Sequence, residues 1–531
     1  MDNICFFSSE QIHIYGDLQR RINLNYSRME SRHYRPEHIF GADQSGWPGD
    51  WEGRTILALV KLKSSTRREP AYLREILRIL PSKLNKKGYL GKIYGIDSET
   101  GLQLFDEQQL SGHNWLLRGL IEYYILCDDV AAKNIAINIV KNLYLPLMGK
   151  YKDYPLSAKE RTSCQGRYDG NICGKVRNWL ISTDIGCAFM CLDALSQAYE
   201  ILGLEECKEL ADEMLEVFSK INFIESAMQT HATLSACRGI LRLYSVTKDV
   251  KYLDIAVKIF DIYTTNGMTE NYANFNWFSR TDSWTEPCAI VDSWICAMEL
   301  YKYTCKYFYL SLANKIYRNA LCYAQRINGG FGCDKCVTVF QKILAPNGGA
   351  NLTEAFWCCT MRGAEGLSSV SKHIAFYTSD EENTPKSVYI NMLEPFEISC
   401  EHFNMCLDCY DDSFKLSFTN KTGKRIYIYV YNPFCDEHLT MCGELGFCSW
   451  VHKYNKRPVF DGKKFMLGDR ILGVRNIHSG EEVPPAKPGN LEYLSSDTYK
   501  DITTGLIYKP LSDMTDVEID ELSEESRQII F

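Results

Sequence analysis

Long apolar runs are missing from this sequence of 531 residues, and none reaches the roughly 18 consecutive apolar residues that a membrane-spanning helix needs. Clusters of positive charge are missing too: the net charge is −8, and no run of Lys or Arg longer than a pair stands outside a helical pattern. These absences argue against a membrane protein and against nucleic acid as a partner. The sequence also begins without a basic segment followed by a long apolar one, so we expect a soluble protein of the cytoplasm.

Histidine is scarce, with 10 residues, whereas cysteine is abundant, with 22. In a short secreted chain this number would indicate a disulfide framework, but a chain of 531 residues can bury a large core without cross-links. In a reducing compartment we expect most of these cysteines to be free thiols that pack in the core. The remaining few are candidates for metal ligands or nucleophiles, because both roles need a thiolate.

Apolar residues recur every three or four positions from about residue 53 to 372, which indicates a helical region. Within it, amphipathic helices follow one another in pairs, and the first helix of each pair ends in a tyrosine-led segment. These predicted helix ends are Tyr124–Cys127, Tyr199–Leu202, Tyr244–Thr247 and Tyr303–Cys305. Their uneven spacing favours a closed helical toroid over an open solenoid with a fixed repeat.

After about residue 373 the pattern changes to short alternating runs separated by Asn, Asp, Gly and Pro, which indicates β-strands. The clearest runs are Ser387–Asn391, Phe414–Phe418 and Arg425–Tyr431. They predict an antiparallel β-sandwich appended to the helical region. We therefore expect two domains, at residues 1–372 and 373–531, with a C-terminal tail in the second. A strand at Ile12–Tyr15 can join the second domain from the N-terminus.

Two thiol motifs stand out in the second half of the helical region. Cys358 and Cys359 are adjacent, and such neighbours rarely form a disulfide with each other because the intervening peptide strains the bridge. Glu286 and Cys288 lie two residues apart, so their side chains point the same way if the segment is extended. Together they supply one oxygen and three sulfur donors, a set that Zn²⁺ accepts in tetrahedral geometry. From spacing alone, reduced core thiols are an equally good interpretation.

A third cysteine pair, Cys333 and Cys336, has the C-x-x-C spacing of metal and redox sites. It directly follows the glycine-rich segment Gly329–Gly332. An ordinary loop is the interpretation that we favour for this pair, and its role stays open.

The order of the motifs resembles the β-L-arabinofuranosidases of glycoside hydrolase family 127 and their relatives. The resemblance rests on Gly267–Glu270, on Glu286–Cys288, whose Glu286 follows Glu270 by sixteen residues, and on the pair Cys358 and Cys359. It extends over about residues 50–400 through landmarks in the same order. These are Gly88–Gly91, Ser111–His113, His231–Ala232, Leu243–Tyr252 and Tyr389–Asn391.

The resemblance implies an (α/α)6 helical barrel followed by an antiparallel β-sandwich domain. It also implies a retaining glycoside hydrolase of the β-L-arabinofuranosidase kind, acting on a small oligosaccharide or glycoside. The family's zinc site consists of one Glu and three Cys, which would fall on Glu286, Cys288, Cys358 and Cys359. A homodimer is one assembly that the sequence leaves open.

The family's catalytic roles can be placed on single residues. Cys358 would be the nucleophile that attacks the anomeric carbon, and Glu270 would be the acid/base. His113 and His231 would bind the substrate. The chemistry is consistent, because a retaining glycosidase needs a nucleophile and an acid/base, and a metal-bound thiolate can replace the usual second carboxylate. For each histidine taken alone, a helix-packing imidazole is the alternative.

Two positions depart from the family pattern. The family often follows its cysteine pair with Pro-Pro-Asn, whereas this chain continues with Thr360, Met361 and Arg362. A further substrate histidine is expected between the two matched ones, but Ser182–Asp184 contains none. The sugar is therefore open, and Arg362 beside the nucleophile suggests a carboxylate-bearing sugar as one alternative. Two others are an (α/α)6 enzyme in which Cys358 is structural and a carbohydrate-binding relative without catalysis.

Overall fold

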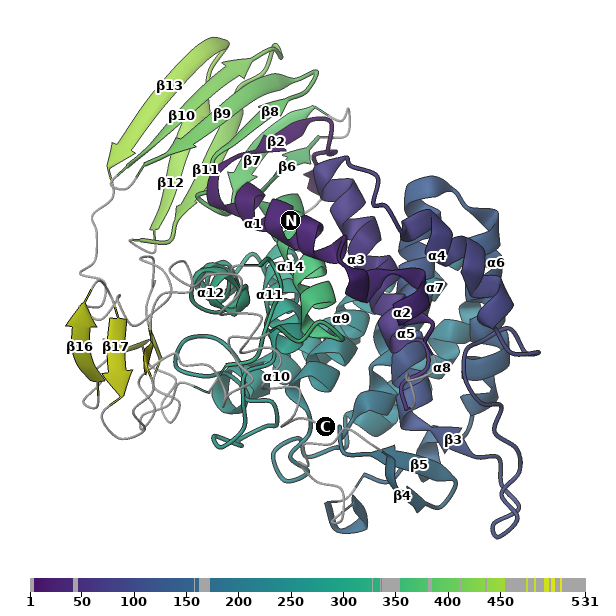
Figure 1. Cartoon of the computed structure of the whole chain (residues 1–531). Coiled ribbons are helices and arrows are strands. Elements are labelled where there is room, and N and C mark those ends of the chain that lie inside the picture. Colours follow the sequence, from purple (N-terminus) through teal and green to yellow (C-terminus); the bar gives the residue numbers. More distant parts are fainter. Residues whose placement is uncertain are drawn as a thin grey trace.

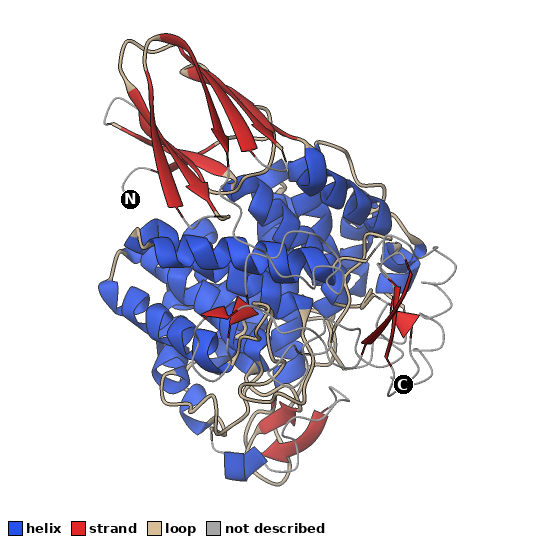
Figure 2. Cartoon of the chain, turned by 90° about the vertical axis from the view of Figure 1, so that its left-hand side faces the viewer, coloured by secondary structure: helices blue, strands red, loops and turns tan. Residues whose placement is uncertain are grey.

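The computed structural model divides into a helical part and a part made of strands (Figure 1). It describes residues 4–41, 46–156, 158–161, 172–326, 328–334, 336, 354–380, 384–410, 413–434 and 437–453, with short strands beyond. Helices dominate up to residue 373, and strands dominate from residue 375 to 453. Figure 2 shows these strands as a layered unit at one end of the helical body.

Six long helices pack against one another in succession at the centre of the helical part. The contacts run from α3 to α5, α7, α9, α11 and α14, and α14 in turn contacts α3. The helices are α3 (Asp50–Thr66), α5 (Glu107–Cys127), α7 (Cys191–Leu202), α9 (Thr230–Thr247), α11 (Pro287–Thr304) and α14 (Cys359–His373). We call them the central helices. Their succession brings segments that are far apart in sequence, such as α3 and α14, side by side.

Most of the remaining helices pack against a central helix. Helix α1 contacts α3 and α14, α4 contacts α3, and α6, α8, α10 and α12 contact α5, α7, α9 and α11, respectively. Their bounds are α1 (Gly16–Met29), α4 (Leu73–Ile79), α6 (Val130–Ile139), α8 (Glu205–Phe218), α10 (Val250–Asn266) and α12 (Tyr307–Ile316). Two short helices are α2 (Pro36–Ile39) and α13 (Cys322–Ala324).

The helix ends predicted from the tyrosine-led segments are confirmed. Helices α5, α7, α9 and α11 end within these segments, at Cys127, Leu202, Thr247 and Thr304. Two features of this part were not predicted. Helices begin earlier than residue 53, with α1, and a small sheet interrupts the helical pattern. Its strands are β3 (Phe105–Asp106), β4 (Ile172–Val176) and β5 (Trp179–Ser182).

Glycines allow α3 and α5 to approach closely. A Cβ atom on Gly53 would lie 2.0 Å from the backbone nitrogen of Leu116, and one on Gly112 would lie 2.3 Å from the carbonyl oxygen of Pro48. No side chain fits at such distances, so both positions require glycine. The close approach places the Arg54 guanidinium of α3 4.2 Å from the centre of the Trp115 ring of α5.

The strands form two five-stranded sheets, ordered β1-β6-β7-β11-β12 and β13-β10-β9-β8-β2. The first comprises β1 (Ile4–Phe6), β6 (Ala375–Ser379), β7 (Pro385–Ile390), β11 (Ile426–Asn432) and β12 (Glu437–Gly443). The second comprises β2 (Ile12–Ile14), β8 (Phe396–Ser399), β9 (Phe403–Cys409), β10 (Ser413–Asn420) and β13 (Gly446–Lys453). Buried residues alternate along β9 and β10, as expected for a sheet with one face in a core.

Each sheet includes one strand from the N-terminus. Strand β1 pairs with β6, and β2 pairs with β8, both antiparallel. Strand β2 falls in the segment for which the sequence indicated an added strand. One pairing differs from the predicted antiparallel arrangement, because β7 and β11 are parallel. The chain between them passes through β8, β9 and β10 of the other sheet, which supplies the crossover that parallel strands need.

Beyond residue 453 the structure describes only short strands. They are β14 (Val474–Arg475), β15 (Glu482–Val483), β16 (Leu491–Ser495), β17 (Thr498–Asp501) and β18 (Ile507–Tyr508). The predicted C-terminal tail lies outside the described residues. Among the residues described, no helix combines the length and apolarity needed to cross a membrane.

Candidate metal centre

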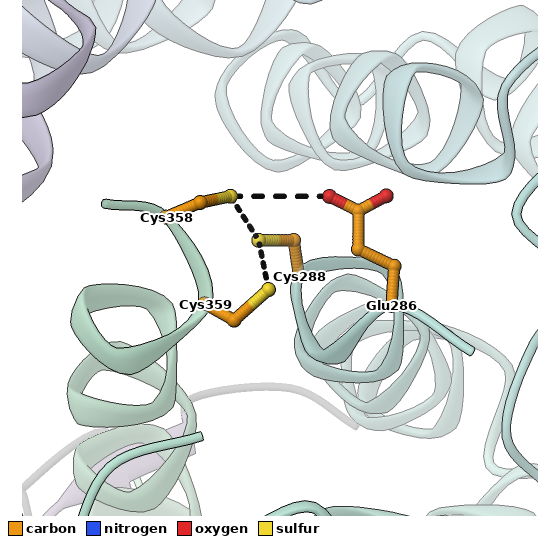
Figure 3. Close-up of side chains that lie close together, drawn as sticks. All are labelled: Glu286, Cys288, Cys358 and Cys359. Carbon is orange, nitrogen blue, oxygen red and sulfur yellow. Dashed lines mark hydrogen bonds between the residues drawn. The ribbon is translucent and has the colours of Figure 1, made fainter. Parts of the chain in front are cut away.

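Four side chains predicted as metal ligands come together in the structure (Figure 3). Glu286, Cys288, Cys358 and Cys359 each offer one donor atom, and these atoms lie within 4.8 Å of one another. Cys288 Sγ lies 3.1 Å from Cys358 Sγ and 3.8 Å from Cys359 Sγ, and Cys358 Sγ lies 3.9 Å from Glu286 Oε1. The fold thus joins two motifs about 70 residues apart, and the four residues together could bind a metal ion.

The cluster lies at the N-terminal ends of two neighbouring helices. Glu286 is the residue before α11, and Cys288 is the second residue of that helix. Cys358 is the residue before α14, and Cys359 is its first residue. Helix N-termini carry a partial positive charge and unpaired N–H groups, so both ends favour thiolate and carboxylate groups.

Access and proton affinity distinguish Cys358 from the other two thiols. Cys288 and Cys359 are at most 2% exposed, whereas Cys358 is only partly buried. Hydrogen bonds from the Cys288 and Cys359 thiols lower the pKa of Cys358 well below its usual range. Burial instead raises the pKa of Cys288 well above it. Cys358 is therefore the thiol of the three that combines thiolate character with access to a ligand.

The Glu286 carboxylate is the clearest sign that this donor set suits a metal. Its Oε2 atom is buried and has no hydrogen-bond partner among the described residues. Burial, with a further contribution from the Cys358 sulfur, raises the pKa of Glu286 well above its usual range. A buried oxygen without a partner costs free energy, and a bound cation removes that cost. One carboxylate and three sulfur atoms fit a tetrahedral site for a thiophilic ion.

Arg54 contacts the cluster and was not found from the sequence. Its Nη1 donates to Cys288 Sγ at 3.6 Å, its Nε donates to both Asp50 carboxylate oxygens at 2.9 Å, and its Nη2 lies 3.4 Å from His231 Nε2. The guanidinium also stacks over Trp115. These contacts fix a positive charge beside the thiols. The charge lowers the pKa of Cys358 further, after the hydrogen bonds from the two other cysteines.

His231, predicted to bind substrate, lies next to Arg54 near the start of α9. Its Nδ1 lies 2.8 Å from Asp292 Oδ2, and its ring stacks on Trp115 with centroids 5.6 Å apart. Burial lowers the pKa of His231, although the hydrogen bond to Asp292 opposes this effect. The neutral ring therefore donates from Nδ1 to Asp292 and presents the lone pair of Nε2 towards Arg54.

His113, the second predicted substrate ligand, is fully buried in α5. Its Nδ1 lies 2.8 Å from the carbonyl oxygen of Gln109, and its Nε2 accepts a hydrogen bond from the Leu90 backbone nitrogen at 3.0 Å. Burial lowers the pKa of His113 to about 4, so the ring is neutral. Both ring nitrogens are thus bonded to the backbone. The arrangement matches the alternative of a helix-packing imidazole and leaves neither nitrogen for a sugar.

Glu270, the predicted acid/base, lies in the loop between α10 and α11 and is 2% exposed. This loop turns back on itself, with a bridge between Met268 and Asn274. Asn274 Oδ1 accepts a hydrogen bond from the Glu286 backbone nitrogen at 3.0 Å. The loop that carries Glu270 is therefore attached to the start of α11, where the cluster lies.

The sequence suggested Arg362 as a ligand for a carboxylate-bearing sugar, but its guanidinium pairs with carboxylates of the chain itself. It is 1% exposed and forms ion pairs with Asp292 and Glu365. Burial lowers the pKa of Arg362 to about 10, so the side chain stays positively charged at neutral pH. Because two carboxylates of the chain neutralise it, the structure does not favour Arg362 as the ligand of an acidic sugar.

Asp184 lies just after β5, in the segment where the family pattern has a further substrate histidine and this chain has none. Its backbone nitrogen donates to Ser182 Oγ at 3.1 Å, and its partly buried carboxyl group makes no hydrogen bond within the described part of the chain. Burial and the nearby Cys358 sulfur raise the pKa of Asp184 to about 7. The chain thus places another titratable carboxyl group near Cys358. The sequence drew attention to this position only because the expected histidine is missing there.

No protein family model matches this sequence, and no curated protein sequence does either. Solved structures do match its fold. A glycoside hydrolase has 9% sequence identity and a TM-score of 0.59, and the match covers 85% of this chain and 78% of that one. A β-arabinofuranosidase of glycoside hydrolase family 127 has 12% identity and a TM-score of 0.60, with 86% and 82% covered.

A further match is the family 127 β-L-arabinofuranosidase Ara127N from Geobacillus stearothermophilus T6. It has 11% identity and a TM-score of 0.55, and the match covers 84% of this chain and 83% of that one. The expected resemblance is therefore confirmed at the level of the fold, over both the helices and the strands. Within that fold, this chain carries a buried Glu/Cys cluster of the composition that the resemblance implied.

Proposed function

We propose that this protein is a retaining glycoside hydrolase of the β-L-arabinofuranosidase kind, with Cys358 as the nucleophile and Glu270 as the acid/base. Its substrate is a small oligosaccharide or glycoside. The central observation is the Cys358 thiol, which is only partly buried and whose pKa is lowered by hydrogen bonds from two buried thiols. Its Sγ atom lies 3.9 Å from Glu286 Oε1. The match in fold to family 127 structures supports this assignment.

The architecture that we propose follows from the helix contacts. The central helices and the helices packed on them close an (α/α)6 barrel within residues 1–372, and residues 373–531 contain the β-sandwich domain. The succession of contacts that leads from α3 back to α3 supports closure. The N-terminal ends of α3, α9, α11 and α14 then share one end of the barrel, since Arg54 contacts both His231 and Cys288, and Cys288 contacts Cys359. We place the active site at this end.

We propose Zn²⁺ as the metal, held by Glu286, Cys288, Cys358 and Cys359. When bound, zinc would keep the coordinating sulfur atoms deprotonated at neutral pH and fix their orientation. The soft sulfur donors support zinc over Mg²⁺ or Ca²⁺, which prefer oxygen.

The reaction uses two groups of the chain in two steps. The Cys358 thiolate attacks the anomeric carbon, and the bond from that carbon to the leaving oxygen breaks while Glu270 donates its proton to this oxygen. In the second step Glu270, now a carboxylate, removes a proton from water. The water oxygen attacks the same carbon, and Cys358 leaves as a thiolate. A low thiol pKa assists both steps, because the thiolate is the attacking form and is also a good leaving group.

We propose that His231 contacts the sugar through Nε2, which exchanges its 3.4 Å contact with Arg54 for a sugar hydroxyl, while Asp292 binds Nδ1 and so fixes the tautomer. His113 has a different role in this proposal. Its bonds to Gln109 and Leu90 hold the segment before α5 in place, so it supports the site without touching the substrate.

The assignment is tested with the zinc-loaded protein and a panel of aryl glycosides that starts with the L-arabinofuranoside. We expect turnover on at least one furanoside and about one zinc per chain. Glu270→Gln should reduce kcat by about 10²-fold to 10⁴-fold, the usual contribution of an acid/base, while zinc stays bound. Cys358→Ser should abolish turnover. Cys207→Ser serves as the matched control, because Cys207 is buried in α8 and lies outside the cluster.

Sugar binding without turnover, unchanged in Glu270→Gln, would contradict this proposal. That result would identify a carbohydrate-binding protein instead. Turnover that survives both Cys358→Ser and removal of the metal with a chelator would show that the nucleophile is a different group.

A further inference from the structure

Asp50 is a partly exposed carboxylate beside Arg54, the arginine that contacts the cluster. It is the first residue of α3, and Arg54 follows one turn later in the same helix. The Arg54 guanidinium joins the carboxylate to the cluster, because its Nε donates to Asp50 and its Nη1 donates to Cys288. A single guanidinium group therefore separates Asp50 from the thiols. Neither the resemblance nor the proposed function assigns a role to this carboxylate.

The Asp50 carboxylate keeps most of its capacity to accept hydrogen bonds. Both of its oxygens share one N–H group, that of Arg54 Nε, and no other hydrogen bond reaches them within the described part of the chain. A carboxylate can accept about four hydrogen bonds. Arg54, in contrast, uses its two other nitrogens on Cys288 and His231. The acceptor positions that remain on Asp50 are thus available to a ligand.

Access also distinguishes Asp50 from its partner. The side chain of Asp50 is 16% exposed, whereas that of Arg54 is 5% exposed. Burial raises the pKa of Asp50 to about 6, although the Arg54 charge opposes this effect, so protein surrounds the carboxyl group. A group that is surrounded by protein and still keeps accessible surface lies in a recess. At neutral pH it is mostly ionised and accepts hydrogen bonds.

Close packing fixes the backbone around Asp50. Gly49, the residue before it, has a φ of +88°, and a Cβ on Gly112 of α5 would lie 3.0 Å from the Asp50 backbone nitrogen. The Asp50 nitrogen donates to the Trp47 carbonyl oxygen at 3.1 Å, and Glu52 Oε2 accepts from the Gly49 nitrogen at 3.1 Å. A carboxylate held in this way loses little conformational freedom when it binds a ligand.

We propose that the Asp50 carboxylate binds a hydroxyl group of the sugar and makes the site select neutral sugars over sugars that carry a carboxylate. This inference rests on the proposed function, because it names the class of sugar that the same site accepts. A hydroxyl donates to an anionic acceptor, whereas a second carboxylate in the same recess is repelled. Arg54 is already neutralised by Asp50, and Arg362 is paired with two other carboxylates, so neither offers its charge to an acidic sugar.

The test compares two glycosides that differ in charge. They are p-nitrophenyl β-L-arabinofuranoside and the same glycoside with its primary hydroxyl group oxidised to a carboxylate. We expect the wild-type chain to prefer the neutral glycoside by at least about 100-fold in kcat/KM, because like charges repel. Asp50→Asn should lower kcat/KM for the neutral glycoside by about 10-fold to 100-fold, the usual worth of a hydrogen bond to a charged group, and should narrow the preference at least about tenfold. Zinc content should stay at the wild-type level, which shows that the cluster is intact.

Asp17→Asn is the matched control. Asp17 also lies in the first turn of a helix and also pairs with an arginine four residues later, Arg21, at 2.6 Å. Within the described part of the chain its carboxylate bonds only to Arg20 and Arg21, and it contacts no residue of the cluster. We expect Asp17→Asn to leave kcat/KM and the preference between the two glycosides unchanged.

A second measurement separates a contact with the sugar from an indirect effect through Arg54. It uses deoxy analogues of the neutral glycoside, each of which lacks one hydroxyl group, with the wild-type chain and with Asp50→Ala. Loss of the hydroxyl that Asp50 binds should lower kcat/KM by about 10-fold to 100-fold in the wild-type chain and by less than about twofold in Asp50→Ala, where the contact is already absent. A purely structural role would give additive losses with every analogue.

Either additive losses with every analogue or an unchanged preference in Asp50→Asn would overturn the role of Asp50 and leave the proposed function intact. Wild-type protein that hydrolyses neither glycoside would count against the proposed function instead. Calorimetric binding of the same two glycosides then tests Asp50 by itself. Tighter binding of the neutral glycoside, with this preference lost in Asp50→Asn, would support the role of Asp50, and equal binding of both glycosides to the wild-type chain would overturn it.

Discussion

The central helices and the β-sandwich bury different kinds of side chain. In β10 of the sandwich, Phe414, Leu416 and Phe418 are buried and apolar, whereas Lys415 between them is exposed. The central helices instead point charged side chains inward, and five of these, each from a different helix, are at most 5% exposed. They are Arg118 of α5, Asp193 of α7, Arg238 of α9, Asp292 of α11 and Glu365 of α14. We call these five residues the buried charge network.

The buried charge network is stable because its members pair across helices. Asp292 accepts from Arg238 at 2.6 Å, Glu365 accepts from Arg118 at 2.9 Å and from Arg238 at 2.6 Å, and Arg118 lies 2.9 Å from Asp193. A buried charge that loses its partner costs several kcal/mol. The network therefore favours one relative orientation of the helices that contribute to it.

The buried charge network also connects to the Glu/Cys cluster, to which the strands of the sandwich contribute no residue. Asp292 accepts a hydrogen bond from His231 Nδ1, and His231 Nε2 lies next to Arg54. Arg54 in turn donates to the Cys288 sulfur. The apolar side chains of the sandwich stabilise it by packing, whereas the paired charges of the central helices both stabilise those helices and position residues beside the cluster. Three substitutions test this difference, in order of expected effect.

Asp292→Ala should have the largest effect. It removes the carboxylate that accepts from His231 Nδ1, and it removes one of the carboxylates that pair with Arg238 and with Arg362. We expect a loss of about 3 to 5 kcal/mol in the free energy of unfolding, measured by urea denaturation of the full chain. Zinc affinity should fall as well, because His231 and Arg54 lose their support beside the thiols.

The matched control for Asp292→Ala is Glu216→Ala. Glu216 is also a paired helical carboxylate, 3.1 Å from Lys220, but its side chain is 76% exposed. Solvent screens this pair, so its loss should change the free energy of unfolding by no more than about 0.5 kcal/mol. Similar losses in both variants would mean that burial does not distinguish the network from ordinary surface charge.

Leu416→Ala tests the sandwich side of the comparison. Leu416 is fully buried in β10, and its truncation should lower the free energy of unfolding by about 2 to 4 kcal/mol through lost apolar contacts and the cavity left behind. Zinc content should stay at the wild-type level, because no strand residue is a ligand. Lys415→Ala, one residue earlier and exposed, should change stability by less than about 0.5 kcal/mol. A loss of zinc in Leu416→Ala at full folding would contradict the separation of the two regions.

The ligand cluster could be predicted from the sequence because each half of it is local. Glu286 and Cys288 are two residues apart, and Cys358 and Cys359 are adjacent, so the sequence alone keeps the members of each pair close together. The helix ends were predictable for the same reason, because a periodic pattern and its end are local features. That the two pairs meet came from the resemblance, since spacing alone left reduced core thiols as an equal interpretation. Zinc, the catalytic roles and barrel closure stay predictions.

Residues brought to the site by tertiary contact alone could not be predicted. Arg54 belongs to α3, and neither its type nor its neighbours in the sequence distinguish it from other helical arginines. Asp184 lies in a loop that is bonded to a distant segment, since the Gln229 backbone nitrogen donates to the Ile185 carbonyl oxygen at 3.0 Å. His113 fits the resemblance by sequence, but only the structure shows that the backbone occupies both of its ring nitrogens.

The parallel pairing of β7 and β11 escaped prediction because alternation along a strand is the same in both directions of pairing. The small sheet in the helical part was missed for a related reason. Strands β3, β4 and β5 are short, and a run of two to five residues contains too little alternation to distinguish it from a loop.

Asp17→Asn removes a carboxylate–arginine pair that lies outside the interior, and it should lower the stability least of the three substitutions. Asp17 lies in the first turn of α1 and, like Asp292, pairs with two arginines: Arg20 and Arg21 each lie 2.6 Å away. Its side chain is 36% exposed, however. Burial opposes its ionisation, but Arg21 and Arg20 outweigh burial and lower the pKa of Asp17 to about 2.

The sign of the pH dependence follows from this pKa. Because the folded-state pKa of Asp17 lies below its ordinary value of 3.8, its ion pairs stabilise the protein above about pH 3.8, and the contribution disappears as the pH falls through about 2. With allowance for solvent screening, Asp17→Asn should lower the free energy of unfolding by about 0.5 to 1 kcal/mol at pH 7 and by less at pH 3, measured by urea denaturation at both pH values. A loss of unfolding free energy as large as that of Asp292→Ala would show that a partly exposed ion pair stabilises the protein as much as a pair in the buried charge network. The contrast between charged interior and apolar sandwich would then lose its physical basis, because that basis is the burial of the charges.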